Sequence, residues 1–217
     1  VQGLHQNEMM HTVIIGEQGM GKTVVANILG NIYKDLGILK KGTFTIAQRA
    51  DFVGEYLGST AIKTQNLLES CIGGVLFIDE AYSLGNKEQR DSFSKEAIDT
   101  INQFLSENTE NFICIIAGYE KSLKECFFDH NPGLERRFPW KFKLEKYTPS
   151  ELGDILVYQV NELGWSYCPE DLNHVLKLIS DAKELFTNNG GDCLMYFDKC
   201  KIHHAKRVFG KNSPKFV

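Results

Sequence analysis

Uninterrupted apolar runs in the chain predict strands that are buried on both faces. The clearest runs are 75–78 and 112–117, in which every side chain is apolar. Such runs are typical of parallel sheets, because helices then cover both faces of the sheet. Shorter apolar or alternating runs predict three further strands. The expected strands are 12–15, 43–47, 75–78, 112–117 and 142–144.

Between these strands, apolar residues recur at the spacing of amphipathic helices. The strongest example is 92–105, in which Phe93, Ile98 and Ile101 fall on or near one side. The other expected helices are 24–36, 60–72 and a short one that ends at 128. The alternation of strand and helix predicts an α/β fold, in which helices flank a five-stranded parallel sheet.

The pattern changes near residue 147. Thr148-Pro149-Ser150-Glu151 reads as a capping box with Pro at the first helical position, which is a strong signal for the start of a helix. Helical spacing continues through 151–163, 170–186 and 192–209, and no strand pattern returns. We therefore expect two domains, an α/β core over 1–147 and a small all-helical domain over 148–217.

Composition limits the kinds of partner. The 217 residues include 42% apolar side chains and carry a net charge of −4, with a pI near 5.9. Bulk charge is therefore not expected to draw this chain to nucleic acid or to an acidic membrane surface. No apolar run approaches the roughly 18 residues of a membrane span, and residues 1–11 lack the basic start and apolar core of a signal peptide. A cytoplasmic protein is expected.

The six cysteines show no C-x-x-C pair and no tight disulfide framework. This pattern favours reduced thiols inside a cell. Cys193, Cys200, His203 and His204 are the residues to consider for zinc. Their spacing suits two faces of one helix better than one tetrahedral site, so a zinc site is not the expectation.

The most specific motif leads from the first expected strand into the first helix. Residues 16–23 fit G-x-x-x-x-G-K-[ST] at every fixed position. A strand, a glycine loop and a helix N-terminus in this order form a phosphate-binding loop. Lys22 is expected to reach the outer phosphates, and the Thr23 hydroxyl to hold Mg²⁺. The residues expected to contact the nucleotide here are Gly16, Glu17, Gln18, Gly19, Met20, Gly21, Lys22, Thr23 and Val24.

Two acids follow the buried run 75–78. Open α/β sheets bind ligands at the carboxyl ends of their strands, so Asp79 and Glu80 are expected beside the phosphate loop. Asp79 would hold Mg²⁺ together with Thr23, and Glu80 would orient and deprotonate the attacking water. A water-activating glutamate favours hydrolysis over phosphate transfer to another metabolite. The sequence therefore predicts an ATPase that uses ATP and Mg²⁺.

These motifs and several further segments resemble the AAA+ ATPases, and within them the CbxX/CfqX group, which includes red-type rubisco activase and stage V sporulation protein K. The resemblance covers nearly the whole chain. It is carried by the phosphate loop and by segments at 56–61, 73–84, 93–99, 117–119 and 131–138. It implies a P-loop AAA+ core followed by a helical lid. It also implies a homo-oligomeric ring, usually a hexamer, with ATP at the subunit interfaces.

The resemblance implies roles that the residues alone do not establish. Arg137 falls where the family places its arginine finger, which reaches ATP bound by the neighbouring subunit. A structural ion pair is the alternative, and it fits Arg136 better. Tyr56 and Leu57 match the pore loop that grips a substrate polypeptide, although by composition this loop could equally be a buried turn. Tyr119 lies at the sensor-1 position, where many AAA+ proteins use Asn.

The sequence departs from the family at two places. The sensor-2 stretch Gly-Asn-Ala-Arg reads Gly-Asp-Cys-Leu at 191–194, so the Arg that would touch the γ-phosphate from the lid is absent. The second departure lies before the first strand. The family has a helical segment at this place, which in this sequence is occupied by residues 1–7. The expected function is a ring-forming ATPase that remodels a protein partner. Two alternatives stay open: a nucleotide-dependent assembly platform with weak turnover, and a AAA+ protein that acts on nucleic acid.

Overall fold

The computed structural model describes residues 9–56, 58–88, 91–109 and 111–209. They form two compact units. The first contains the described residues up to Gly16 and Lys22–Leu144, and the second contains Glu17–Gly21 and the described residues from Glu145 onward. Leu57 of the expected pore loop and the segment 1–7 lie outside the described residues.

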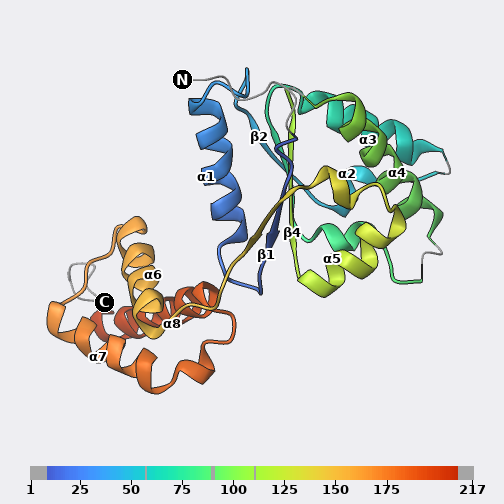
Figure 1. Cartoon of the computed structure of the whole chain (residues 1–217). Coiled ribbons are helices and arrows are strands. Elements are labelled where there is room, and N and C mark those ends of the chain that lie inside the picture. Colours follow the sequence, from blue (N-terminus) through green and yellow to red (C-terminus); the bar gives the residue numbers. More distant parts are fainter. Residues whose placement is uncertain (1–8, 57, 89–90, 110, 210–217) are drawn as a thin grey trace. The chain divides into compact units, whose positions relative to one another are not determined.

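Five parallel strands form one sheet in the first unit, in the order β2-β3-β4-β1-β5 (Figure 1). The strands are β1 (Thr12–Ile15), β2 (Phe44–Ala47), β3 (Val75–Ile78), β4 (Ile113–Gly118) and β5 (Trp140–Lys143). The predicted α/β fold with a five-stranded parallel sheet is therefore confirmed. Because every strand runs in the same direction, all carboxyl ends lie at one edge of the sheet.

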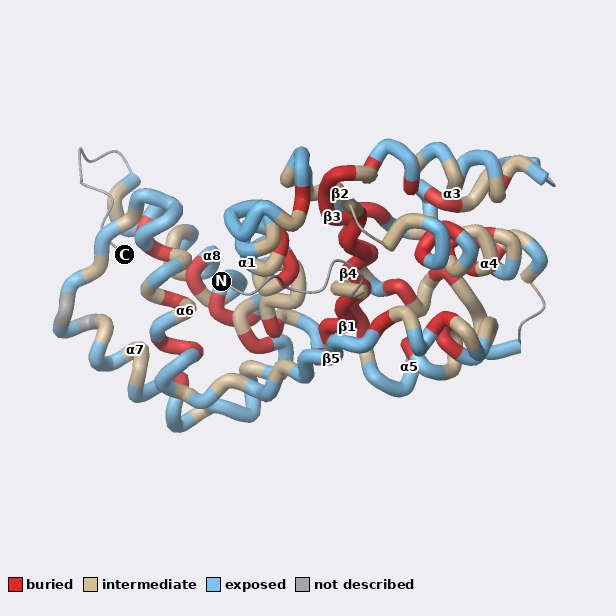
Figure 2. Tube along the Cα trace, turned by 45° about the horizontal axis from the view of Figure 1, so that its top comes forward, coloured by how far each residue is buried: buried red, intermediate tan, exposed pale blue. Residues whose placement is uncertain are grey.

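Side chains alternate between the two faces of the sheet and enter two separate cores. Ile14, Phe77 and Ile115 pack with α1 on one face. Val13 and Leu76 pack on the other face, where helices α3 and α4 contribute to the core. Figure 1 shows α1 on one side of the sheet and α3, α4 and α5 on the other, and Figure 2 shows that the strands between them are mostly buried. The helices of this unit are α1 (Lys22–Asp35), α2 (Arg49–Phe52), α3 (Ser59–Ser70), α4 (Ser92–Glu107) and α5 (Glu120–Cys126).

Two elements of this unit differ from the predictions. Arg49–Phe52 forms the short helix α2, which is not among the helices expected from the sequence. The N–H of Gln48 donates to the Asp51 carboxylate at 2.7 Å, which closes the start of this helix. The last strand runs over Trp140–Lys143 and not over 142–144. The prediction missed its start because all four residues are exposed and leave no apolar run to mark the strand.

Three helices make up most of the second unit: α6 (Pro149–Glu162), α7 (Pro169–Asp181) and α8 (Gly190–Val208). The predicted capping box at the start of α6 is confirmed. The Thr148 N–H donates to the Glu151 carboxylate at 2.7 Å, and the Glu151 N–H donates to Oγ1 of Thr148 at 3.3 Å. The apolar faces of the helices meet in one core that includes Leu152, Ile179 and Phe197.

The predicted helix over 170–186 is wrong in its last part. α7 ends at Asp181, because Ala182 leaves the helical conformation with φ −121° and ψ 33°. A separate 3-10 turn, η4 (Lys183–Leu185), follows. This break shortens the apolar face of α7 and turns the chain toward the start of α8.

The described ranges contain no group of three or more His, Cys, Asp and Glu side chains that is arranged to hold a metal ion. Cys193 and His204 are buried in α8, whereas His203 is exposed. In the part of the chain that the structure describes, no helix combines the length and the apolar character needed to cross a membrane.

Candidate functional site

The predicted phosphate loop begins at the carboxyl edge of the sheet. The N–H of Gly16, which follows β1, donates to the carbonyl of Gly118 at the end of β4, 3.2 Å away. Gly19 and Gly21 have φ angles of +71° and +73°, in the left-handed region that glycine reaches without steric cost. α1 begins at Lys22, so the N–H groups of its first turn follow the loop directly. This is the backbone arrangement of an anion-binding loop.

Lys22 places its ammonium group among the predicted site residues. Its Nζ donates to the carbonyl of Gly16 at 3.0 Å and lies 5.5 Å from the centre of the Tyr119 ring. Burial lowers the pKa of Lys22, and the nearby carboxylates of Asp79 and Glu80 act in the opposite direction. The structure thus brings Lys22, Tyr119 and both acids together at one edge of the sheet.

Asp79 and Glu80 follow the last residue of β3. Asp79 is half-buried, and its Oδ1 accepts the N–H of Glu80 at 3.0 Å. Glu80 is exposed and adopts φ 51° and ψ 47°, a conformation that is uncommon for a residue with a Cβ and that clusters at functional sites. Its carbonyl accepts the N–H of Ser83 at 2.7 Å, within the 3-10 turn η1 (Ala81–Leu84). This sharp turn keeps the Glu80 carboxylate at the surface.

Tyr82 is a member of this group that the sequence motifs did not assign. Its ring lies 5.7 Å from the Tyr119 ring, centre to centre. Burial and a hydrogen bond with Glu80 raise the pKa of Tyr82 to about 12. The hydroxyl therefore keeps its proton near neutral pH and is a donor for the Glu80 carboxylate. The signal in the sequence that could have identified Tyr82 is its position, two residues after a glutamate that follows a buried strand.

The other predicted loop residues differ in exposure. Thr23 is half-buried in the first turn of α1, whereas Val24 is 62% exposed. Met20 is buried, and its sulfur accepts the N–H of Glu17 at 3.0 Å. The Glu17 carboxylate forms an ion pair with Lys146 at 3.0 Å. Thr23 directly follows Lys22 in the first turn of α1, which is the order that the motif requires.

Within the second unit, donors hold the carbonyl groups of the loop. In a trans peptide the carbonyl and the N–H point in opposite directions. Donors on the carbonyl side therefore restrain the direction of the N–H groups that a phosphate would meet. The three hydrogen bonds are Asn189 Nδ2 to Gln18 O (3.2 Å), Gly190 N to Gly19 O (3.1 Å) and Tyr147 Oη to Met20 O (3.0 Å).

Arg137 lies toward the opposite edge of the sheet. It precedes β5, whose first residue, Trp140, is paired with Thr12 at the amino end of β1. Its guanidinium donates from Nε to Oγ of Ser106 at 2.8 Å and from a terminal nitrogen to the carbonyl of Gly133 at 2.5 Å. The fold of the first unit therefore does not bring Arg137 to Lys22 and the two acids of the same chain.

Tyr56 is 74% exposed, so the alternative in which this residue belongs to a buried turn is wrong. The backbone beneath it is held in place. The Tyr56 N–H donates to Oγ of Ser59 at 3.1 Å, and the same hydroxyl donates to the Tyr56 carbonyl at 2.7 Å. Gly58 supports this turn with φ +81°. An aromatic side chain is thus displayed from an anchored turn at the start of α3.

The stretch at 191–194 lies in the first turn of α8. Asp192 is buried, and its carboxylate accepts the N–H of Asn188 at 2.7 Å. Cys193 is buried in the core of the second unit. Leu194, which stands where the family has Arg, is 41% exposed. This turn therefore uses its one charged side chain to hold the start of the helix.

Comparison with known proteins agrees with this geometry. Residues 12–139 match the family described as "ATPase family associated with various cellular activities (AAA)". The chain is 40% identical over 207 residues to a cfxQ-like protein of Acanthamoeba polyphaga mimivirus, covering 95% of this chain and 51% of that protein. It is 41% identical over 170 residues to stage V sporulation protein K of Bacillus subtilis, covering 78% and 52%. The chain thus spans about half the length of these two relatives.

A further relative is covered more fully. The chain is 34% identical over 214 residues to a chloroplastic ribulose bisphosphate carboxylase/oxygenase activase of Cyanidioschyzon merolae, covering 97% of this chain and 73% of that protein. Among solved structures, the FIGL-1 AAA domain in complex with ADP matches with a TM-score of 0.59 at 17% identity, covering 85% and 57%. A RuvB mutant from Thermotoga maritima matches with a TM-score of 0.54 at 19% identity, covering 78% and 50%. These two structures share the fold with this chain.

Proposed function

Because the chain belongs to the AAA ATPase family, whose profile it matches over residues 12–139, we propose that it binds ATP with Mg²⁺ and hydrolyses the nucleotide. The observation that carries this proposal is the meeting of Lys22, Asp79, Glu80 and Tyr119 at one edge of the sheet. A cation that follows a glycine loop in the chain, together with two carboxylates, supplies the positioning and the charge that phosphoryl transfer to water needs.

Each side chain has a separate task in this proposal. Lys22 neutralises charge on the outer phosphates. Thr23 and Asp79 offer the hydroxyl and carboxylate oxygens that Mg²⁺ prefers, and the bound ion would neutralise further phosphate charge. Glu80 accepts a proton from the attacking water. The Tyr82 hydroxyl orients the carboxylate that performs this step.

We infer that Arg137 completes the site of a neighbouring subunit in a homo-oligomeric ring, with a hexamer as the expected form. The β1 strand of four residues separates the two edges of the sheet, a distance of about 13 Å. A guanidinium at the amino edge is therefore poorly placed to act on a phosphate in its own chain. A guanidinium from the next subunit can stabilise the charge of the transition state.

The proposed output of the ring is the remodelling of a protein substrate. Tyr56 is displayed from an anchored turn, and an aromatic ring with a hydroxyl can grip a polypeptide without demanding one sequence. Leu57 is assigned to the same pore loop from the sequence. Residues 148–217 are proposed to act as the lid of the ATPase core.

One observation favours a second candidate, an assembly platform with weak turnover. Leu194 stands where the family has its sensor-2 Arg, so this turn lacks a charge that could act on the γ-phosphate. The ATPase rate of the assembled protein separates the two candidates. Turnover that stays weak in assembled rings, even with a protein client present, would favour the platform.

The first experiment tests the site itself. Lys22→Ala should abolish ATP binding in calorimetry, because it removes the cation at the outer phosphates. Glu80→Gln should bind ATP normally and lose about 10²-fold or more in phosphate release, because an amide cannot accept the proton of the water. Lys143→Gln, which removes an exposed lysine on β5, is the control. Normal turnover in Glu80→Gln protein would remove Glu80 from the mechanism.

The second experiment tests the shared site. Subunits with Arg137→Ala are mixed with subunits that carry Glu80→Gln, and phosphate release is measured over a series of ratios. Some interfaces then pair an intact Glu80 with a neighbour's intact Arg137, so activity should exceed the sum of the two mutants. If mixed rings form and no ratio exceeds that sum, Arg137 does not act in trans.

A further inference from the structure

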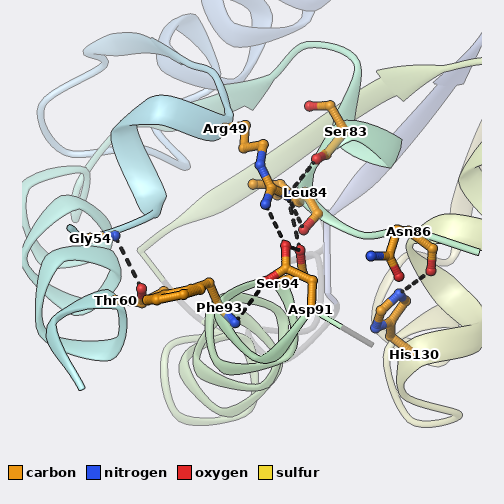
Figure 3. A network of polar contacts seen from close by, with 10 residues as sticks. All are labelled: Arg49, Gly54, Thr60, Ser83, Leu84, Asn86, Asp91, Phe93, Ser94 and His130. Atoms are coloured by element: carbon orange, nitrogen blue, oxygen red, sulfur yellow. Dashed lines mark hydrogen bonds and ion pairs between the residues drawn. The ribbon is translucent and has the colours of Figure 1, made fainter. Parts of the chain in front are cut away.

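The guanidinium of Arg49 lies at a junction of three elements in the first unit (Figure 3). It projects from α2 and donates to the carbonyls of Ser83 at 2.8 Å and Leu84 at 2.9 Å, at the end of η1. It also donates to Oγ of Ser94 at 2.9 Å and to the Asp91 carboxylate at 2.5 Å, at the start of α4. The planar fork of an arginine can serve four acceptors at once, and it links α2, η1 and α4.

The acceptors on η1 are tied to Glu80. η1 begins directly after Glu80, and the Ser83 N–H donates back to the Glu80 carbonyl at 2.7 Å. The last carbonyls of a short helix have no partners within the helix, and Arg49 serves two of them. The left-handed backbone of Glu80 persists only where its surroundings restrain it. By holding η1, Arg49 helps to restrain Glu80.

The acceptors on α4 are themselves firmly held. Asp91 is the N-cap of α4, and its Oδ1 accepts the Phe93 N–H at 3.0 Å. Its other oxygen accepts the hydroxyl of the buried Ser94 at 2.6 Å. The hydrogen bond from Ser94 and the pairing with Arg49 lower the pKa of Asp91 to about 2. The carboxylate is therefore ionised near neutral pH and gives the guanidinium a fixed anchor.

On its other side, α2 leads into the loop that carries Tyr56. Lys63 of α3 donates to the carbonyl of Val53 at 2.9 Å, directly after α2. The Gly54 N–H donates to Oγ1 of Thr60 at 3.1 Å, as Figure 3 shows. These bonds fix the chain between α2 and the turn from which Tyr56 is displayed. A displacement of α2 is therefore passed to that turn.

A cavity of 710 Å³ opens between α2 and the end of β3. Arg49, Lys63, Asp79 and Glu80 are among the residues that line it. Both cations donate to acceptors of the chain, so they do not mark an anion site. The pairing of β2 with β3 ends at Ala47 and Ile78. Beyond that pairing, open space lies between α2 and Glu80, and the polar path through η1 and Arg49 adds a direct link between them.

From these contacts we propose that Arg49 is a positioning residue for Glu80 and couples the Glu80 segment to the Tyr56 loop. The proposal rests on the proposed ATP hydrolysis and extends it to a residue outside the nucleotide motifs. A shift of Glu80 and η1 moves Arg49 and α2, and hence the loop. A coupling free energy acts in both directions, so a load on Tyr56 also acts on the Glu80 segment.

The test compares Arg49→Gln and Arg49→Lys with a control, Lys143→Gln, which likewise removes the cation of an ion pair. Melting temperature, ADP affinity, kcat and KM for ATP are measured on each protein. For Arg49→Gln we expect kcat to fall about tenfold or more, the scale of loss when a catalytic group is misplaced. KM and ADP affinity should stay within about twofold. Arg49→Lys keeps a charge for Asp91 and should recover part of kcat.

Coupling to the loop is measured by amide hydrogen exchange with and without ADP. In wild-type protein ADP should change exchange in both 80–84 and 54–59. In Arg49→Gln protein the change at 80–84 should persist and the change at 54–59 should be lost. Equal responses of the two proteins at 54–59 would overturn the coupling.

The remaining outcomes also decide the proposal. A kcat within about twofold of wild type in folded Arg49→Gln protein overturns it, as does an equal loss of kcat and ADP affinity, which marks general damage. If Arg49→Gln does not fold, Asp91→Asn decides, because Asn also caps helices while the charged partner of Arg49 is lost. Normal kcat in Asp91→Asn protein, or failure of both variants to fold, then counts against a positioning role. A wild-type chain without ATPase activity refutes the proposed function instead, and the exchange measurement still tests the coupling.

Discussion

Mild acid should destabilise the first unit through one buried histidine, His11. Its side chain is fully buried, and its Nδ1 accepts the N–H of Cys114 at 3.0 Å. An accepting Nδ1 places the ring proton on Nε2, and Nε2 has no hydrogen-bond partner among the residues that the structure describes. The rings of Phe112 and Phe138 lie 6.0 and 5.8 Å away. A second proton would break the bond to Cys114 and place a charge in an apolar pocket.

The direction and the size of the effect follow from the pKa. Burial and the positive charge of Arg137 lower the pKa of His11 from 6.5 to about 4. As the pH falls through 6.5, the unfolded chain takes up a proton that the folded chain takes up only near pH 4. The free energy of unfolding is therefore highest above pH 6.5 and decreases as the pH falls toward 4. Between pH 7.5 and pH 5 the expected decrease is about 2 kcal/mol, a large part of the stability of a typical domain.

The measurement is urea unfolding of the first unit at these two pH values. Trp140 lies on β5, and Trp165 packs against the core of the second unit. A Trp165→Phe background therefore lets fluorescence report on the first unit. In this background His11→Asn keeps an oxygen acceptor for the Cys114 N–H but cannot titrate. It should be less stable than its parent at pH 7.5 and lose much less stability at pH 5.

The matched control is His203→Asn, because His203 is exposed on α8. It should leave the pH dependence unchanged. The structural carboxylate of Asp91, whose pKa is lowered to about 2, contributes stability that is lost only as the pH falls from about 4 toward 2, outside the measured range. If the parent and His11→Asn lost equal stability between pH 7.5 and 5, the buried-histidine argument would be refuted.

Three further substitutions test other parts of the molecule. Tyr56→Ala should shift the melting temperature by less than about 2 °C, because Tyr56 is 74% exposed, and should abolish client-stimulated ATPase; a large fall in melting temperature would contradict the exposed position of Tyr56. Gly19→Ala should abolish ADP binding in calorimetry, because its Cβ would meet the Asn188 carbonyl oxygen at 1.8 Å on a backbone with φ +71°; unchanged affinity would contradict this. Phe197→Ala should destabilise the second unit by about 3–5 kcal/mol, since Phe197 is 1% exposed; Trp165, whose ring lies 6.1 Å from that of Phe197, reports the unfolding, and a loss below about 1 kcal/mol would show that the core repacks.

The sheet could be predicted where burial controls the sequence. β3 and β4 are buried along their whole length, so selection for apolar side chains leaves an uninterrupted run. The sequence predicted that β5 begins at residue 142 and not at Trp140, because its four residues are all exposed and leave no apolar run. α2 was not predicted, since four residues do not complete two helical turns and its start depends on the local pairing of Gln48 with Asp51.

The candidate site also has residues that could be placed from the sequence and residues that could not. Lys22, Asp79 and Tyr119 could be expected to meet, because each follows a parallel strand and all carboxyl ends share one edge. Arg49 could not be placed from the sequence. Its acceptors on η1 lie 34 and 35 residues away along the chain and are backbone carbonyls, which any residue type supplies. Tyr82 could not be placed from the sequence either, because its role depends on the turn that Glu80 begins.

The loss of the sensor-2 Arg changes what the second unit could sense, and the loop contacts indicate how. An Arg at Leu194 would act on the γ-phosphate, which distinguishes ATP from ADP. Tyr147, Asn189 and Gly190 act instead on carbonyls of the loop, whose N–H groups serve the α- and β-phosphates of a nucleotide. A ligand shifts an equilibrium only by its differential interaction with the two states. Under the proposed function, helices linked in this way respond to occupancy by either nucleotide, and discrimination of the γ-phosphate falls to Glu80 and to Arg137 of the proposed neighbouring subunit.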